Sequence, residues 1–146
     1  MPQLLAIAIR RASRTPMELL PEATITTEAG VANDFRGKPG KRQVTVVARE
    51  GWTAACHDLN SEVPWTARRA NLFIEGVPLA QSVGRVLRVG EVELEITGET
   101  TPCNRMDEAH DGLQTALKPD WRAGVTCRVL KPGKIAIGDA VQLGDT

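Results

Sequence analysis

The chain has 146 residues, a length that predicts one domain spanning residues 1–146. Its 18 Lys and Arg residues balance its 18 Asp and Glu residues, so the surplus positive charge that duplex-DNA binding needs is missing. Aromatic residues, at 3%, are too scarce for a base-stacking RNA platform, and we expect no nucleic-acid partner. The 42% of apolar residues suffices for an aliphatic core and excludes a disordered chain.

The amino terminus and the cysteine count bear on location. No segment approaches the ~20 apolar residues that cross a bilayer. The apolar start, residues 4–9, runs into Arg10 and Arg11, which is the reverse of the order in a secretory signal. Three cysteines, an odd number, argue against a secreted disulfide framework. We therefore expect a cytoplasmic protein with no membrane partner.

Short apolar segments separated by Gly and Pro predict strands along most of the chain. In the first half they are residues 4–9, the weaker 23–27 and the β-branched 43–48, with a glycine-rich loop over 28–40. Within residues 84–97, Val92, Leu94 and Ile96 alternate with glutamates, a pattern typical of a strand with one buried and one solvated face. The last third predicts strands at 125–130, 135–137 and 141–143.

One helix is predicted over residues 107–118. Apolar or aromatic side chains recur there on one face of a 3.6-residue period, at Met106, His110, Leu113 and Leu117. Asp107 is expected to cap the start of this helix, and Pro119 ends it. A shorter helix is expected near residues 66–70. Together these elements predict a mainly β fold with a few helices, a compact mixed β-barrel.

The three cysteines differ in their expected roles. Cys127 alternates with valines along a predicted strand, so it is expected to be a buried structural residue. Cys56 precedes His57 and Asp58, but sequence neighbours rarely point at one common atom, and a structural role is favoured there too. No C-x₂-C pair occurs and the two histidines are not suitably spaced, so we expect no zinc site.

Cys103 is the candidate reactive residue. It follows the clearest strand and precedes the predicted helix, with Pro102 before it and Arg105 two residues beyond it. A helix amino terminus and a guanidinium both favour thiolate over thiol, which yields a nucleophile or a soft-metal ligand. The alternative is that Cys103 is a loop cysteine without a chemical function.

Basic residues cluster once, with no acid between Asp34 and Glu50; they are Arg36, Lys38, Lys41, Arg42 and Arg49. The first four flank or lie in the glycine-rich loop and predict a site for a phosphate or another small anion. Arg68 and Arg69 add to it if the fold brings them near. An ordinary solvated loop is the alternative.

Several motifs in a fixed order resemble the MOSC family, the domain named after the C-terminal part of molybdenum-cofactor sulfurase. They are the loop 30–34 ending in Asp34, the segment 69–72 around Asn71, the Pro-Cys pair 102–103, and the closing pattern over 124–143. The last two are the more specific. The resemblance covers most of the chain, roughly residues 4–143.

The resemblance implies a β-barrel-like fold that handles the molybdenum cofactor (molybdopterin). It assigns to Cys103 the role of sulfur or persulfide carrier, or of molybdenum ligand, and places Asp34 and Asn71 in the same cleft. The pterin phosphate is then expected near Arg36, Lys38, Arg68, Arg69 and Arg105. No pyridoxal phosphate is expected in this domain.

Three functions remain open from the sequence. The first is a stand-alone cofactor-handling domain whose Cys103 carries sulfur or ligates molybdenum, served by a cysteine desulfurase-type donor. The second is a molybdenum-dependent oxidoreductase that reduces N-hydroxylated bases with a partner reductase. The third is a non-catalytic partner-binding β module.

Overall fold

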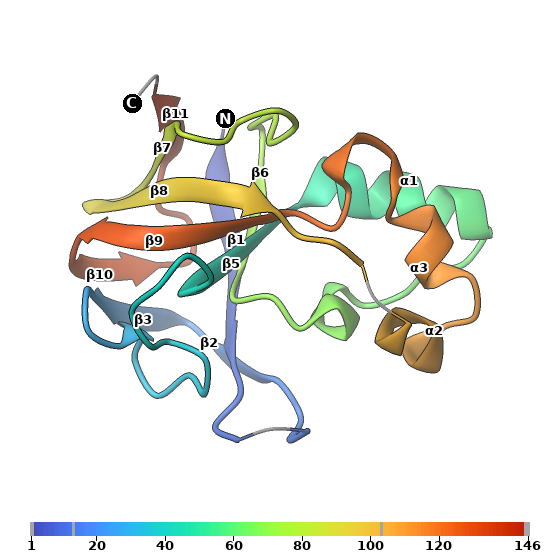
Figure 1. Cartoon of the computed structure of the whole chain (residues 1–146), viewed down its shortest axis with the longest axis horizontal. Helices are drawn as coiled ribbons and strands as arrows, with labels where there is room; N and C mark the ends of the chain where they lie inside the picture. Colours follow the sequence, from blue (N-terminus) through green and yellow to red (C-terminus); the bar gives the residue numbers. More distant parts are fainter. Residues whose placement is uncertain (1, 13, 103, 145–146) are drawn as a thin grey trace.

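The computed structural model describes residues 2–12, 14–102 and 104–144, which fold into two sheets with helices gathered at one end (Figure 1). The larger sheet has eight strands in the order β11-β7-β8-β9-β5-β6-β1-β2, and the smaller has three in the order β10-β3-β4. The strands of the larger sheet are β1 Gln3–Ile9, β2 Glu18–Leu20, β5 Val44–Ala48, β6 Leu72–Glu75, β7 Val86–Val89, β8 Val92–Glu99, β9 Val125–Lys131 and β11 Val141–Gly144. Those of the smaller sheet are β3 Glu22–Thr26, β4 Gly30–Val31 and β10 Gly133–Ala136.

The prediction of a mainly β fold with a few helices is confirmed, although the eight-stranded sheet is not closed into a barrel. Its edge strands, β2 and β11, do not pair with each other; the start of β1 instead contacts the β10–β11 connection, where Leu4 N donates to Asp139 O at 2.9 Å. Buried aliphatic side chains from both sheets form one core, and a second core lies beneath the helices. Among the described residues, no helix is long and apolar enough to span a membrane.

The strand expected within residues 84–97 is an antiparallel hairpin of β7 and β8, turning at Gly90. Val92, Leu94 and Ile96 are fully buried, as their alternation predicts. The opposite face of β8 carries Glu93 and Glu95, which face arginines of the neighbouring strands β7 and β9. The negative charges of these two glutamates are thus neutralised by arginines on the neighbouring strands.

One helix is missing from the sequence-based prediction: α1, Arg49–Leu59. It crosses over between β5 and β6, which are the parallel pair of the sheet and therefore need a long connection. Trp52 and Ala55 are its buried residues, and so short an apolar stripe gives a weak signal. The 3₁₀ helix η1, Trp65–Arg68, follows close to where the shorter helix is expected.

The helix predicted over 107–118 is instead two short helices, α2 Arg105–Ala109 and α3 Leu113–Ala116. The break lies at Gly112, whose φ of +87° is left-handed and incompatible with a continuous helix. Met106, Leu113 and Leu117 are buried on the side that the periodicity indicates. Asp107 does not cap α2; its carboxylate accepts a hydrogen bond from Gln114 N at 2.9 Å, in the first turn of α3.

Replacing Asp107 by alanine is therefore expected to destabilise α3 rather than α2. The lost contact satisfies an N–H at the start of a helix, which is worth about 1 kcal/mol. Urea denaturation compared with the control Asp111→Ala, an exposed neighbour, measures the difference. Equal stability of the two variants would contradict the assignment.

Candidate functional site

A cavity of about 610 Å³ opens between the sheet and the helical end of the molecule. Seven arginines line it: Arg10, Arg14, Arg36, Arg42, Arg68, Arg69 and Arg105. They come from four segments that are distant in sequence, namely the β1–β2 loop, the β4–β5 loop, the end of η1 and the start of α2. The acidic residues of the lining are Asp34 and Glu108, so positive charge dominates.

Most of these arginines form no ion pair with a carboxylate of the described residues. Within residues 2–12, 14–102 and 104–144, no ion pair is formed by Arg10, Arg14, Arg36, Arg42, Arg69 or Arg105. Burial, followed by the charges of Arg69 and Arg36, holds the pKa of Arg10 below its ordinary value; Asp34 opposes this shift. The folded chain thus holds like charges together at a cost that a bound anion would offset.

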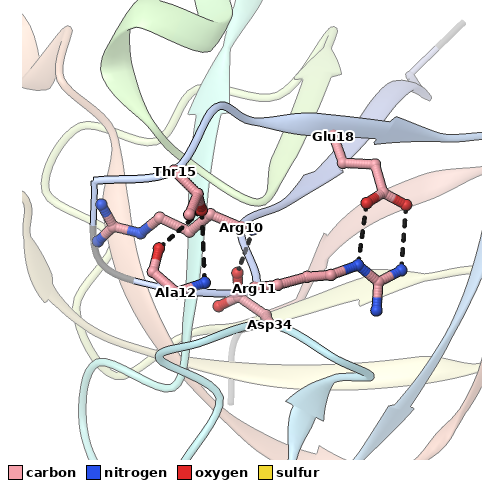
Figure 2. A network of polar contacts seen from close by, with 6 residues as sticks. All are labelled: Arg10, Arg11, Ala12, Thr15, Glu18 and Asp34. Carbon is pink, nitrogen blue, oxygen red and sulfur yellow. Dashed lines mark hydrogen bonds and ion pairs between the residues drawn. The ribbon is translucent and has the colours of Figure 1, made fainter.

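Asp34 organises the cavity through the backbone. One of its carboxylate oxygens accepts a hydrogen bond from Arg10 N at 3.1 Å, and the other accepts one from Arg36 N at 3.2 Å. Figure 2 shows the side chains of Arg10 and Arg11 extending in opposite directions. Arg11 forms an ion pair with Glu18, whereas the preceding residue, Arg10, lines the cavity. The carboxylate therefore joins the two loops that carry Arg10 and Arg36.

Arg69 and Asn71 lie on the segment between η1 and β6. Arg69 has a left-handed backbone with φ of +60°, an uncommon conformation for a residue with a side chain, and its guanidinium donates to Thr15 O. Asn71 is buried: its Oδ1 accepts from Thr45 N at 3.0 Å and its Nδ2 donates to Ala8 O at 3.2 Å. Asn71 thus links β1 and β5 to the start of β6, and it also lines the cavity.

Most of the predicted site residues come together in this cavity. They are Asp34, Arg36, Arg68, Arg69, Asn71 and Arg105. Lys38 does not line it; this residue lines an adjoining hollow of the same loop. Cys103 lies outside the described residues.

The sequence reasoning missed Arg10 and Arg14 as site residues. Both follow β1, and the available signal was the place of Arg10 directly after a buried strand. Threonines also contribute to the lining, and Thr100 has a buried hydroxyl oxygen with no hydrogen-bond partner among the described residues.

The other two cysteines are placed as structural residues. Cys127 is fully buried on β9, and Cys56, on α1, donates its S–H to Val63 O at 3.7 Å. Neither lines the cavity. Within the described part of the chain, no three His, Cys, Asp or Glu side chains gather in a way that could hold a metal ion.

Burial raises the pKa of the Cys127 thiol, so its reactive thiolate is suppressed in the folded state. We expect iodoacetamide to leave Cys127 unmodified in the native protein at pH 8 and to modify it in urea. Peptide mapping by mass spectrometry measures both. Rapid labelling of native Cys127 would contradict the burial.

Comparison with known proteins identifies the family to which this chain belongs. The family model of the MOSC domain matches residues 30–142, and the chain belongs to this family. The molybdenum cofactor is associated with MOSC domains generally. No curated protein gives a significant match to the sequence.

Solved structures share the fold at low sequence identity. The YuaD protein from Bacillus subtilis superposes with a TM-score of 0.81 at 18% identity, covering 98% of this chain and 96% of that one. YiiM from Geobacillus stearothermophilus gives 0.78 at 14% identity, covering 98% and 75%. YiiM from Escherichia coli gives 0.70 at 17% identity, covering 97% and 69%. These likenesses establish the fold of the chain.

Proposed function

We propose that this chain binds the molybdenum cofactor in the arginine-lined cavity. The observation that carries the proposal is the excess of converging arginines: seven against two acidic residues, six of them without an ion pair to any described residue. A pterin phosphate supplies the missing negative charge. The donor set therefore fits the phosphate end of this cofactor.

The arginines suit a phosphate in geometry as well as in charge. Each guanidinium presents a planar fork of N–H donors that can bind phosphate oxygens in pairs. Arg10, Arg36 and Arg69 all line this one cavity, so their guanidiniums are available to the same anion. Asp34 holds the backbones that carry Arg10 and Arg36, and Arg69 is held through Thr15. We assign anion binding to the guanidiniums and positioning to Asp34.

We assign the sulfur chemistry to Cys103. Thr101, two residues before it, and Arg105, two residues after it, both line the cavity. A guanidinium nearby favours the thiolate, which is the form that carries sulfur or ligates a soft metal. As a carrier, Cys103 holds a persulfide, and transfer of the outer sulfur atom to an acceptor returns the cysteine thiolate. The bound cofactor supplies the molybdenum centre.

A sulfur carrier needs a source of sulfane sulfur. The Cys103 thiolate can attack the outer sulfur of a donor persulfide, such as that of a cysteine desulfurase, so that a sulfur–sulfur bond forms on Cys103 while the donor's sulfur–sulfur bond breaks and its thiolate leaves. We therefore propose a desulfurase-type protein as the partner. If Cys103 instead ligates molybdenum, a reductase takes the place of the sulfur donor.

The test is chemical analysis of protein purified from a molybdenum-replete host. We expect bound molybdenum and cyanolysable sulfur in the wild-type chain, and loss of at least one of them in Cys103→Ser. The matched control is Cys56→Ser, which changes a cysteine outside the cavity and should retain both. Equal and negligible amounts in all three proteins would overturn the proposal.

A further inference from the structure

The arginine-lined cavity carries more positive charge than one phosphate neutralises. Seven arginines line it against two acidic residues, whereas a phosphate monoester brings about two negative charges. Under the proposed function, Arg10, Arg36 and Arg69 serve that phosphate. Arg42 and Arg105 also line the cavity, and neither forms an ion pair with a described residue. The cavity therefore has charge for a second anionic group.

Arg42 is fixed against β8 and β9. The residue before it, Lys41, accepts a hydrogen bond at its carbonyl oxygen from Thr97 Oγ1 on β8. The residue after it, Gln43, is 1% exposed and accepts through Oε1 from Val129 N on β9 at 3.0 Å. The backbone of Arg42 is thus anchored on both sides, and its guanidinium starts from a fixed point at this end of the sheet.

Thr100, directly after β8, has a hydroxyl that lacks a partner. Its backbone N donates to Gly124 O at 2.9 Å, which holds it against the segment that leads into β9. Its Oγ1 is buried without a hydrogen-bond partner among the described residues, and the residue lines the cavity. A buried hydroxyl without a partner costs free energy, which an acceptor atom of a ligand would recover. An oxyanion offers such acceptors to a hydroxyl and to guanidiniums at once.

These donors border the segment that contains Cys103. Thr100 and Thr101 precede this residue in the chain and Arg105 follows it, and all three line the cavity. The second anion is therefore expected where the sulfur chemistry is assigned. A protein-bound persulfide would bring no oxyanion to these donors, whereas a small sulfur donor such as thiosulfate carries its own.

We propose that Arg42, Arg105 and the Thr100 hydroxyl bind the oxyanion end of a small thiosulfate-type sulfur donor. The inference rests on the proposed function in one respect, the assignment of sulfur chemistry to Cys103. The Cys103 thiolate attacks the sulfane sulfur of thiosulfate, so that a sulfur–sulfur bond forms on Cys103 while that of the donor breaks, and sulfite leaves with the bonding electron pair. The step consumes no oxidant or reductant. Because negative charge grows on the departing oxyanion, fixed donors around it speed the step.

Sulfur loading from thiosulfate tests this activity. The full chain is purified from a molybdenum-depleted host, so the result does not depend on supply of the metal. We expect release of about one sulfite ion per wild-type chain, with cyanolysable sulfur left on the protein, and neither in Cys103→Ser. The control Cys56→Ser, which changes a cysteine outside the cavity, should release as much sulfite as the wild type.

A second donor separates this inference from the proposed function. If a purified cysteine desulfurase loads sulfur onto Cys103 but thiosulfate does not, the inference is wrong and the carrier role stands. If neither donor loads Cys103, the assignment of sulfur chemistry to this residue fails as well.

Substitutions test the anion contacts. Arg42→Gln and Thr100→Val should each lower the second-order rate of loading from thiosulfate at least about tenfold, while Thr100→Ser, which keeps the hydroxyl, should stay within about twofold. Thr100→Val should keep the thermal midpoint of the wild type, because the hydroxyl that it removes has no partner among the described residues. The controls are Arg128→Gln and Thr53→Val, which change exposed residues outside the cavity and should alter the rate by no more than about twofold.

A neutral reagent corrects for changes in the thiolate itself. Methyl methanethiosulfonate modifies the Cys103 thiolate with loss of methanesulfinate, and it brings no anionic group to the arginines. We therefore expect the ratio of the thiosulfate rate to the methyl methanethiosulfonate rate to fall about tenfold in Arg42→Gln and in Thr100→Val. A ratio that stays at the wild-type value in both variants would overturn the inference.

Discussion

Replacing Arg10 and Arg105 by glutamate is expected to weaken anion binding at least a hundredfold while leaving the folded chain as stable as before, or more so. Loss of two charge-assisted contacts, each worth about 1.5–3 kcal/mol, accounts for the affinity. Burial, and then the charges of Arg69 and Arg36, disfavour the charged form of Arg10 in the folded state. Burial disfavours a carboxylate there as well, so the opposite sign of the stability effect comes from removing the repulsion between like charges. A glutamate there would be attracted to the remaining arginines.

Two measurements separate these effects. Titration with inorganic phosphate gives the affinity, and the thermal midpoint without ligand gives the stability. The control is Lys131→Glu with Lys134→Glu, which lowers the net charge equally on a different part of the surface. A lower midpoint together with unchanged phosphate affinity would mean that the arginines serve the fold, and the binding site would have to be sought elsewhere.

Asn71→Ala is expected to destabilise the chain by about 3 kcal/mol. The substitution leaves Thr45 N–H and Ala8 C=O without the amide that satisfies them, and each unpaired buried group costs about 1–3 kcal/mol. The affected strands, β1, β5 and β6, also support the loops that carry the cavity arginines. Anion binding should therefore weaken as a consequence of the structural damage.

The control for this prediction is Asn104→Ala, an exposed asparagine before α2 whose side chain makes no capping hydrogen bond. Urea denaturation of the two variants should differ by most of the 3 kcal/mol. If Asn71→Ala unfolds like the wild type but loses anion binding, Asn71 contacts the ligand directly, as the family resemblance implies, and is dispensable to the sheet.

Local sequence pattern predicted much of the fold because alternation and turn residues act locally. β8 is the clearest example: its alternating apolar residues predict which face of the strand is buried. The helix expected over 107–118 shows the limit, because apolar spacing continues across Gly112 although the helical backbone does not. α1 was missed because its stability comes from packing in the second core, around Trp52, rather than from a strong periodic stripe.

The site was predictable only in part, because it is assembled from four distant segments. The basic loop and the Arg68–Arg69 pair were visible as local clusters, but their meeting with Arg105 depends on the β5-α1-β6 crossover. Arg10 gave no local signal beyond its place after β1. Lys38 shows the converse: it belongs to the basic cluster of the sequence, yet it lies outside the cavity.

The central claim, that the arginine cavity holds the molybdenum cofactor, is tested most directly by one measurement. It is the amount of pterin per chain in wild-type protein purified from a molybdenum-replete host, determined after oxidation to a fluorescent pterin. We predict close to one pterin per chain, with pterin lost from the Arg10→Glu, Arg105→Glu variant. Wild-type protein without pterin, despite an abundant supply of the cofactor in the same cells, would contradict the claim.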